Sequence, residues 1–182
     1  MLPYKLPKPL RVPQEIADVA STLERAGYEA FVIGGSVRDL IIGRKPKDWD
    51  IATNAKPEQI IALFPKTFYE NTFGTVGVVN ETTEDETLKI VEVTPYRTES
   101  GYSDNRHPDH VSFSTNLEDD LKRRDFTINA LAGHVKDNLI STVIDTFGGV
   151  KDIKDKIVRT VGKPEERFGE DALRILRAVR IS

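Results

Sequence analysis

Two aspartates, Asp48 and Asp50, flank Trp49, the chain's only tryptophan, in the stretch RKPKDWDIAT. On an extended strand, side chains at positions i and i+2 point the same way, so the two carboxylates would project together while Trp49 packs on the other side. Two neighbouring carboxylates repel each other unless a divalent cation lies between them, and Mg²⁺ prefers oxygen ligands. The pair is therefore a candidate metal site, although most short D-x-D pairs occupy solvated turns.

Glu92 supplies a third carboxylate. In the stretch TLKIVEV, Leu88, Ile90 and Glu92 would share one face of a strand because side chains alternate along it. If this strand lies beside the one that carries Asp48 and Asp50, the three carboxylates could hold two Mg²⁺ ions. A two-metal site of this kind activates an attacking oxygen and stabilises a leaving one in phosphoryl transfer.

Gly34 and Gly35 follow a short apolar run and precede Ser36 and a short helical pattern, in the stretch VIGGSVRD. Glycines let the backbone approach a ligand closely, and N–H groups at a helix N-terminus favour phosphate. Arg38, one turn into the helix, could reach a phosphate with its fork of donors. The alternative is a plain strand-to-helix turn with Arg38 on a solvated face. The spacing fits neither the G-x-G-x-x-G fingerprint of dinucleotide folds nor the P-loop.

Asp171, Arg174, Arg177 and Arg180 recur every three residues in the stretch EDALRILRAVR. On an α-helix this spacing forms a slowly turning polar stripe. The opposite, apolar stripe consists of Phe168, Ala172, Ile175, Leu176 and Val179. Since an aspartate accepts hydrogen bonds and an arginine donates them, the polar stripe could meet the Watson–Crick edge of a base. The alternative is an amphipathic helix with a basic solvated face and an ion pair between Asp171 and Arg174.

A second charged cluster opens the stretch RRDFTINA and consists of Arg123, Arg124 and Asp125. We expect it just beyond a helix that begins near Leu117, with Phe126 and Ile128 buried. Taken alone, it could equally be an ordinary group of charges at a helix end.

The elements that position these residues predict a mixed α+β domain. We expect helices over Gln14–Ala26, over Val37–Ile42 and after Pro57, and strands at YEAFVI, WDIAT, GTVGVVN and TLKIVEV. A polar loop should run from Pro95 to Thr115, and a hairpin should turn at Asp137-Asn138. The amphipathic pattern continues to the last residue, so we expect a chain cut inside a second, helical region whose continuation would bury the apolar stripe.

Composition narrows the class of protein. The chain has 182 residues, enough for one well-buried core and the start of a second unit. Its Pro- and Lys-rich start does not look like a secretory signal, and no apolar run approaches the roughly 18 residues of a membrane span. The absence of cysteine excludes a disulfide scaffold and fits a reducing cytoplasm. A net charge of −3 means that any polyanion must be held by a local patch.

Together the motifs resemble the class II tRNA nucleotidyltransferase (CCA-adding enzyme) and bacterial poly(A) polymerase family, within the polymerase-β-like superfamily. GGSVRD followed by DWD is similar to the family's first signature, and RRDFTINA to its ribose- and nucleotide-binding motif. DTFGGVKDI resembles the connector between head and neck, and EDALRILRAVR resembles the neck helix that reads the incoming base. The motifs follow the family's order from Gly34 to Arg180, which makes the set specific where each one alone is weak.

The resemblance implies an architecture and a reaction. Residues 1–150 would form a polymerase-β-like head with a mixed, largely antiparallel sheet flanked by helices, and residues 151–182 the beginning of an all-helical neck. The reaction would add CMP and AMP from CTP and ATP to the 3′ end of tRNA without a nucleic-acid template, in the cytoplasm and away from membranes, with Mg²⁺ as cofactor.

The resemblance also implies residue roles. Asp48 and Asp50 would hold two Mg²⁺ ions, and Glu92 would complete the catalytic set. Arg124 would contact the nucleotide and Asp125 its ribose hydroxyls, whereas Asn129 would brace the loop. The implied nucleotide-binding residues are Gly34, Gly35, Ser36, Arg38, Arg124, Asp125, Asp171, Arg174, Arg177 and Arg180, of which Asp171 and Arg174 would select the base.

Two other functions fit the same motifs. A bacterial poly(A) polymerase or an A-adding enzyme shares all of them, and a nucleotide-binding module that is inactive without a missing body and tail is the third reading. The length of the segment from Pro95 to Thr115 is similar to the flexible loop of CCA-adding members and argues against a CC-only enzyme. His107 stands where many members have an arginine, and His107, His110 and His134 show no metal-ligand spacing.

Overall fold

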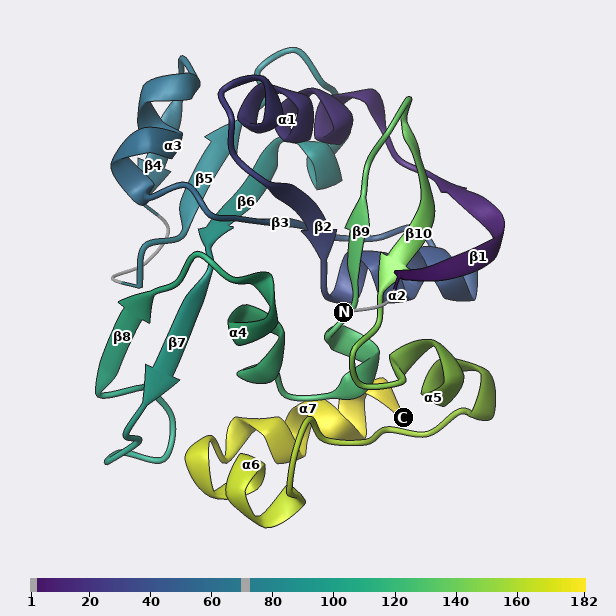
Figure 1. Ribbon diagram of the computed structural model, residues 1–182, viewed down its shortest axis with the longest axis vertical. Coiled ribbons are helices and arrows are strands. Elements are labelled where there is room, and N and C mark those ends of the chain that lie inside the picture. Colours follow the sequence, from purple (N-terminus) through teal and green to yellow (C-terminus); the bar gives the residue numbers. More distant parts are fainter. Residues whose placement is uncertain (1–2, 70–72) are drawn as a thin grey trace.

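The computed structural model describes residues 3–69 and 73–182, and its centre is a mixed sheet of eight strands. These strands are β1 (Pro3–Arg11), β2 (Ala30–Ile33), β3 (Trp49–Thr53), β4 (Thr67–Tyr69), β5 (Val76–Val79), β6 (Ile90–Pro95), β9 (Ala132–His134) and β10 (Leu139–Ile144). Their order in the sheet is β1-β10-β9-β2-β3-β6-β5-β4 (Figure 1). Strands β3 and β6 pair in parallel, and the other described neighbours pair antiparallel. The predicted α+β class with a mixed, largely antiparallel sheet is confirmed.

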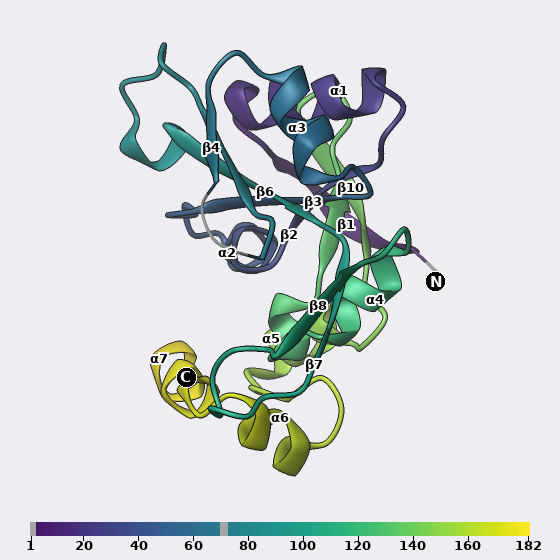
Figure 2. The same ribbon diagram turned by 90° about the vertical axis from the view of Figure 1, so that its left-hand side faces the viewer.

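Helices flank the sheet in two groups. They are α1 (Gln14–Arg25), α2 (Gly35–Ile42), α3 (Pro57–Leu63), α4 (Leu117–Lys122), α5 (Gly149–Asp155), α6 (Pro164–Glu170) and α7 (Leu173–Ile181), with 3₁₀ turns η1 (Glu86–Leu88) and η2 (Thr127–Asn129). Helices α1 and α3 lie together at one end of the molecule, and α4 to α7 lie toward the other (Figures 1 and 2). The predicted helices at Gln14, Val37, Pro57 and Leu117 are all present.

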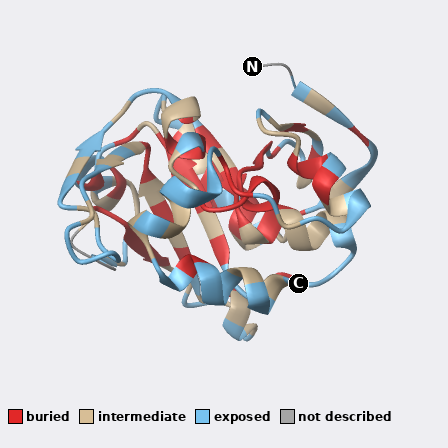
Figure 3. Ribbon diagram, turned by 90° about the horizontal axis from the view of Figure 1, so that it is seen from below, coloured by how far each residue is buried: buried red, intermediate tan, exposed pale blue. Residues whose placement is uncertain are grey.

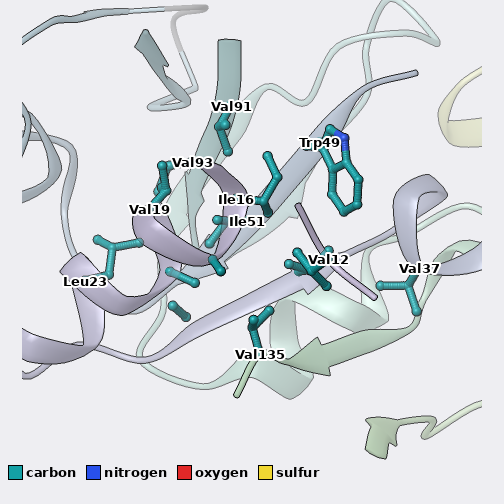
Figure 4. Packing of buried hydrophobic residues seen from close by; sticks show 14 of the residues in the cluster. Val12, Ile16, Val19, Leu23, Val37, Trp49, Ile51, Val91, Val93 and Val135 are labelled. Carbon is teal, nitrogen blue, oxygen red and sulfur yellow. The ribbon is translucent and has the colours of Figure 1, made fainter. Parts of the chain in front are cut away.

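Alternation along the central strands separates two cores. Val32 and Ile51 belong to the larger core, which packs against α1, whereas their neighbours Ile33 and Ala52 belong to a smaller one beside α4. Trp49 is buried in the larger core (Figure 4). Because side chains alternate on a strand, Asp50 projects to the opposite face, toward α4. The prediction that Trp49 packs away from Asp50 is thus confirmed, whereas Asp48 lies in a bend before β3 begins and not on the strand as expected.

The prediction of a polar loop from Pro95 to Thr115 is wrong in part, because this segment contains a two-stranded antiparallel sheet. Strands β7 (Arg97–Ser100) and β8 (His110–Phe113) pair there with Arg97 opposite Phe113. Hydrophobic periodicity does not predict these strands, because the largely buried side chains of β7 are charged rather than apolar. Arg97 and Glu99 are only 12% and 8% exposed and form an ion pair with each other.

The C-terminal amphipathic segment is two helices rather than one. Asp171 has extended backbone angles, φ −142° and ψ 107°, and separates α6 from α7. Its carboxylate accepts the N–H of Leu173 at 2.9 Å, a local bond that competes with helix continuation. On α7, Ile175, Leu176 and Val179 are 51%, 66% and 71% exposed, so this part of the predicted apolar stripe has no cover among the described residues. Phe168, on α6, packs its ring against that of Phe126. Figure 3 shows the buried residues concentrated along the sheet.

Two smaller expectations have different outcomes. The hairpin at Asp137-Asn138 is confirmed: both residues have positive φ, as a tight two-residue turn between β9 and β10 requires. Leu88, however, lies in η1 and not on the strand face of Ile90 and Glu92. Asp85 accepts the N–H of Thr87 at 3.0 Å and so starts a 3₁₀ turn before the strand begins.

Among the described residues, no helix is long and apolar enough to cross a membrane.

Candidate active site

The turn between β2 and α2 brings three kinds of group to one place. Gly34 has φ +73° and ψ −135°, a conformation that residues with a side chain rarely adopt. Its N–H donates to the carbonyl of Leu131 at 3.1 Å. A Cβ placed on Gly34 would lie 3.1 Å from Nη1 of Arg124 and 3.7 Å from Oδ2 of Asp50. A bare backbone, a guanidinium and a carboxylate therefore converge at the N-terminus of α2.

The acidic pair lies at the beginning of β3. Asp48 is exposed in the bend before the strand, and Asp50 is half-buried on it. Burial raises the pKa of Asp50, Arg124 lowers it and the nearby Asp48 raises it, so that the pKa lies above its usual value. The candidate metal ligands are the carboxylate oxygens of Asp48 and Asp50, and each carboxylate disfavours the negative charge of the other. A hard divalent cation prefers oxygen ligands of this kind.

Glu92 is the cross-strand neighbour of Asp50. The parallel register of β3 and β6 sets Asp50 opposite Glu92, so both side chains lie on the same face of the sheet. Within residues 3–69 and 73–182, however, no three His, Cys, Asp or Glu side chains lie close enough together to hold a metal ion. The register thus agrees with the expected neighbourhood, while the three-carboxylate metal site stays a prediction.

Arg38 and Ser36, both on α2, are held differently. Arg38 donates from Nη1 to Oδ1 of Asn129 at 2.7 Å and from Nε to Oδ1 of Asp39 at 2.9 Å, and its side chain folds back over Gly35. The guanidinium therefore lies beside the glycine turn. The hydroxyl of Ser36 is buried and donates to the carbonyl of Ile33 at 2.8 Å, a bond that closes the turn.

Arg124 is fixed by a carboxylate that the motifs did not single out. Asp120, on α4, is fully buried and accepts from Nη2 of Arg124 at 3.0 Å and Nη2 of Arg123 at 2.6 Å. Arg123 also pairs with Glu99 of β7 at 3.0 Å. The spacing of Asp120 to Arg123 and Arg124, three and four residues along a helix, is a signal that could have identified the pairing.

Asp125 is buried and already holds three donors. Its Oδ1 accepts from the N–H of Phe126 at 2.7 Å and from Nδ2 of Asn129 at 3.1 Å, and its Oδ2 accepts from Nε of Arg177 at 2.8 Å. A carboxylate offers about four acceptor positions, so one remains for a further donor such as a hydroxyl. Asn129 is 5% exposed and makes contacts within the protein, as expected.

The four residues expected on one polar stripe are separated. Asp171 precedes α7, whereas Arg174, Arg177 and Arg180 lie on it. Arg174 is buried and pairs with Glu170 at 2.7 Å, while its Nε is 4.0 Å from Asp171. Arg177 turns to Asp125, and Arg180 is exposed. The structure brings Arg177 to the group around Asp125 and holds Arg174 against α6.

The histidines lie outside this group. His107 pairs with Asp104, and His134 with Glu24, at side-chain exposures near one half. His110 is exposed at the start of β8. The prediction that the three histidines are surface or loop residues is confirmed.

Comparisons with known proteins agree on one family. The family described as "Poly A polymerase head domain" matches residues 30–159. The CCA-adding enzyme of Lactobacillus helveticus is 51% identical over 165 residues, which cover 90% of this chain and 39% of that enzyme. The CCA-adding enzyme of Geobacillus stearothermophilus is 48% identical over 168 residues, 92% of this chain and 39% of that enzyme. The chain thus spans about two fifths of the length of the curated relatives that it matches.

Solved structures show the same fold. The crystal structure of the Bacillus stearothermophilus CCA-adding enzyme in complex with CTP superposes with a TM-score of 0.78 at 45% identity, covering 92% of this chain and 38% of that one. The Thermotoga maritima CCA-adding enzyme complexed with tRNA superposes with a TM-score of 0.71 at 26% identity, covering 94% of this chain and 38% of that one.

Proposed function

The chain belongs to the poly A polymerase head domain family, and from that premise we propose that it is the catalytic head of an enzyme that adds CMP and AMP from CTP and ATP to the 3′ end of tRNA. The observation that carries the proposal is the convergence of Asp50, Arg124 and the bare backbone of Gly34 at one helix N-terminus. The relatives support the choice of reaction, since all those reported above are CCA-adding enzymes, and one was solved with CTP and another with tRNA.

Asp48 and Asp50 would hold Mg²⁺, with Glu92 beside them on β6. When bound, the two ions would activate the attacking 3′-hydroxyl and stabilise the leaving pyrophosphate. The protein's own contribution is positioning and charge: Arg38 and the turn at Gly34 and Gly35 would receive the triphosphate. Ser36 would contribute indirectly by stabilising that turn, because its hydroxyl already donates to the carbonyl of Ile33.

The sugar and base of the nucleotide would bind on the side of the site where α7 lies. Arg124 is held at the turn by Asp120 and would face the nucleotide, and Asp125 would accept from the ribose hydroxyls. Asp171, Arg174, Arg177 and Arg180 would contribute to recognising the base. In the structure Arg174 and Arg177 are paired within the protein, so this role requires each to exchange a protein partner for the nucleotide.

The head would be followed by a helical region. The boundary expected at residue 150 falls inside α5, and α5 packs tightly on η2: a Cβ on Gly149 would lie 2.2 Å from the carbonyl oxygen of Thr127. We therefore place α5 with the head and begin the helical region at α6. A cytoplasmic location goes with the proposed substrate.

The test is single-nucleotide extension of tRNAs that end before C, after C and after CC, by the full-length protein that carries this sequence. Addition that stops at CCA supports the proposal, whereas long A tails would identify a poly(A) polymerase. Nucleotide binding without any extension would identify a binding module.

The matched variants are Asp48→Ala and Asp50→Ala, with Asp155→Ala as the control. Each of the first two should lower the extension rate by about 100-fold or more, because the developing charge loses its stabilisation. Asp155, paired with Lys151 on the surface of α5, lies outside the site and its loss should leave the rate unchanged. Full extension by both site variants would overturn the metal assignment.

A further inference from the structure

A continuous series of hydrogen bonds between side chains joins α2, the helix that follows the Gly34 turn, to α7. It starts at Arg38 on α2, passes through Asn129 in η2 and Asp125, and ends at Arg177 on α7. The three distances are 2.7, 3.1 and 2.8 Å. Asn129 lies at its middle and is 5% exposed. The two residues that flank it are those proposed above to receive the triphosphate and the ribose.

Only one orientation of the Asn129 amide satisfies both neighbours. A guanidinium can donate but not accept, and a carboxylate can accept but not donate. The amide oxygen must therefore face Arg38 and the amide nitrogen Asp125, which is the observed arrangement. The reverse orientation would set donor against donor and acceptor against acceptor. Arg38 and Asp125 thus determine the orientation of the Asn129 amide. In turn, the amide holds the Arg38 guanidinium and the Asp125 carboxylate in a defined position relative to each other.

Arg38 and Asp125 each have a further partner besides Asn129. Asp39 holds the other side of the Arg38 guanidinium at 2.8 Å from Nη2, and the N–H of Phe126 holds Oδ1 of Asp125. Without the Asn129 side chain, Arg38 and Asp125 would keep these partners but lose the one side chain that is bonded to both of them. A buried amide that spans two site residues in this way is a means of positioning them together rather than one at a time.

We propose that Asn129 is a positioning residue that couples triphosphate binding to recognition of the ribose, and so contributes to the choice of ribonucleotides over deoxyribonucleotides. The inference rests on the proposed function, because it takes Arg38 and Asp125 as nucleotide contacts. Asn129 itself does not touch the nucleotide. Its effect reaches the substrate through the directions of the Arg38 guanidinium and the Asp125 carboxylate.

Two substitutions separate the two sides of the coupling. Asn129→Asp keeps an acceptor for Arg38 but places a second carboxylate against Asp125, so it should disturb the ribose side more than the phosphate side. Asn129→Ala removes both bonds and should disturb both. Asn80→Ala is the matched control, because Asn80 also makes a side-chain bond, to the carbonyl of Leu88 at 2.7 Å, but lies outside the chain of bonds.

The experiment measures kcat and KM for CTP and dCTP with the full-length protein, together with unfolding by urea. For Asn129→Asp we expect the preference for CTP over dCTP to fall by about 10-fold or more, with a smaller change in KM for CTP. For Asn129→Ala we expect the same loss of preference and a raised KM for both nucleotides. Asn80→Ala should keep the wild-type preference even if its unfolding midpoint falls.

The outcomes distinguish this inference from the proposed function. A wild-type protein that adds no nucleotide refutes the function itself. A wild-type protein that extends tRNA but does not discriminate CTP from dCTP overturns the inference alone. The inference is also overturned if either Asn129 variant, folded at the assay temperature, keeps the wild-type preference, or if Asn80→Ala loses it to the same degree.

Discussion

The carboxylate of Asp120 lies 3.0 Å from Nη2 of Arg124, and this ion pair is made by a fully buried anion. The same carboxylate holds Arg123 at 2.6 Å, and Arg123 reaches Glu99 on β7. The cluster therefore joins α4, the β7–β8 hairpin and the candidate site through charges that have little access to water. Since Arg124 also lies against the Gly34 turn, Asp120 determines where a candidate nucleotide contact points.

Replacing Asp120 should destabilise the protein strongly. Asp120→Ala leaves Arg123 and Arg124 without their shared anion, and breaking a buried pair in this way typically costs about 3–5 kcal/mol. Urea unfolding should show this loss. The control is Glu81→Gln, which removes an exposed partner of Lys66 and should change the free energy of unfolding little, because exposed pairs contribute little. An Asp120→Ala protein as stable as wild type would mean that the cluster does not support the fold.

The same cluster should make stability depend on pH in the acid range. Burial alone would raise the pKa of Asp120, but Arg124 and Arg123 outweigh it and hold the pKa below its ordinary value of 3.8. Glu99, whose burial is outweighed by Arg123 and Arg97, likewise has a pKa below 4.5. A lowered pKa contributes stability that is fully present above the ordinary value and is lost as pH falls through the lowered one.

We therefore expect the free energy of unfolding to fall as the pH drops below about 4, and to fall less steeply in Asp120→Asn. Urea unfolding at a series of pH values for the two proteins measures the difference. Because the other carboxylates are common to both, the difference isolates the cluster. Parallel curves would contradict the lowered pKa of Asp120.

The Gly34 turn should tolerate no side chain. Gly34→Ala combines a strained backbone, at about 1–3 kcal/mol, with a Cβ that would press on Nη1 of Arg124. Gly27→Ala is the matched control: its φ is +88°, and a Cβ there meets nothing within 4 Å. Both variants should lose stability in urea, but only Gly34→Ala should also lose tRNA extension by the full-length protein. Equal activity in the two would show that the contact with Arg124 does not matter.

The contrast between the glycine turn and the hairpin shows how far the sequence determines the site. The apolar run before Gly34 and the period of α2 are local signals, so the strand, the turn and the helix could all be predicted. The strands β7 and β8 could not, because the charged side chains of β7 are largely buried by pairing. Glu99 pairs both with Arg97 and with Arg123, which is 24 residues beyond Glu99. Burial that depends on a distant partner leaves no periodic pattern nearby.

The break at Asp171 has a similar origin. The apolar period continues across it, so the sequence predicts one helix from Phe168 onward. At the break the backbone of Asp171 is extended, and its carboxylate accepts the N–H of Leu173, just before Ala172 and the start of α7. Periodicity reports which face of a helix is apolar, but it does not report whether a side chain has taken over a backbone hydrogen bond.

Asp171 consequently has two candidate roles, which a pair of substitutions can separate. Asp171→Asn should keep the bond to the N–H of Leu173, because the asparagine side-chain oxygen also accepts, whereas Asp171→Ala removes this bond and should lose about 1 kcal/mol. If Asp171 also presents its carboxylate to the incoming base, the asparagine variant should choose wrongly between CTP and ATP although its stability is unchanged, because an amide adds a donor where the carboxylate has only acceptors. Urea unfolding and single-nucleotide extension after C and after CC measure the two effects. Unchanged choice in Asp171→Asn, together with lower stability in Asp171→Ala, would leave the bond to Leu173 as the only role of Asp171.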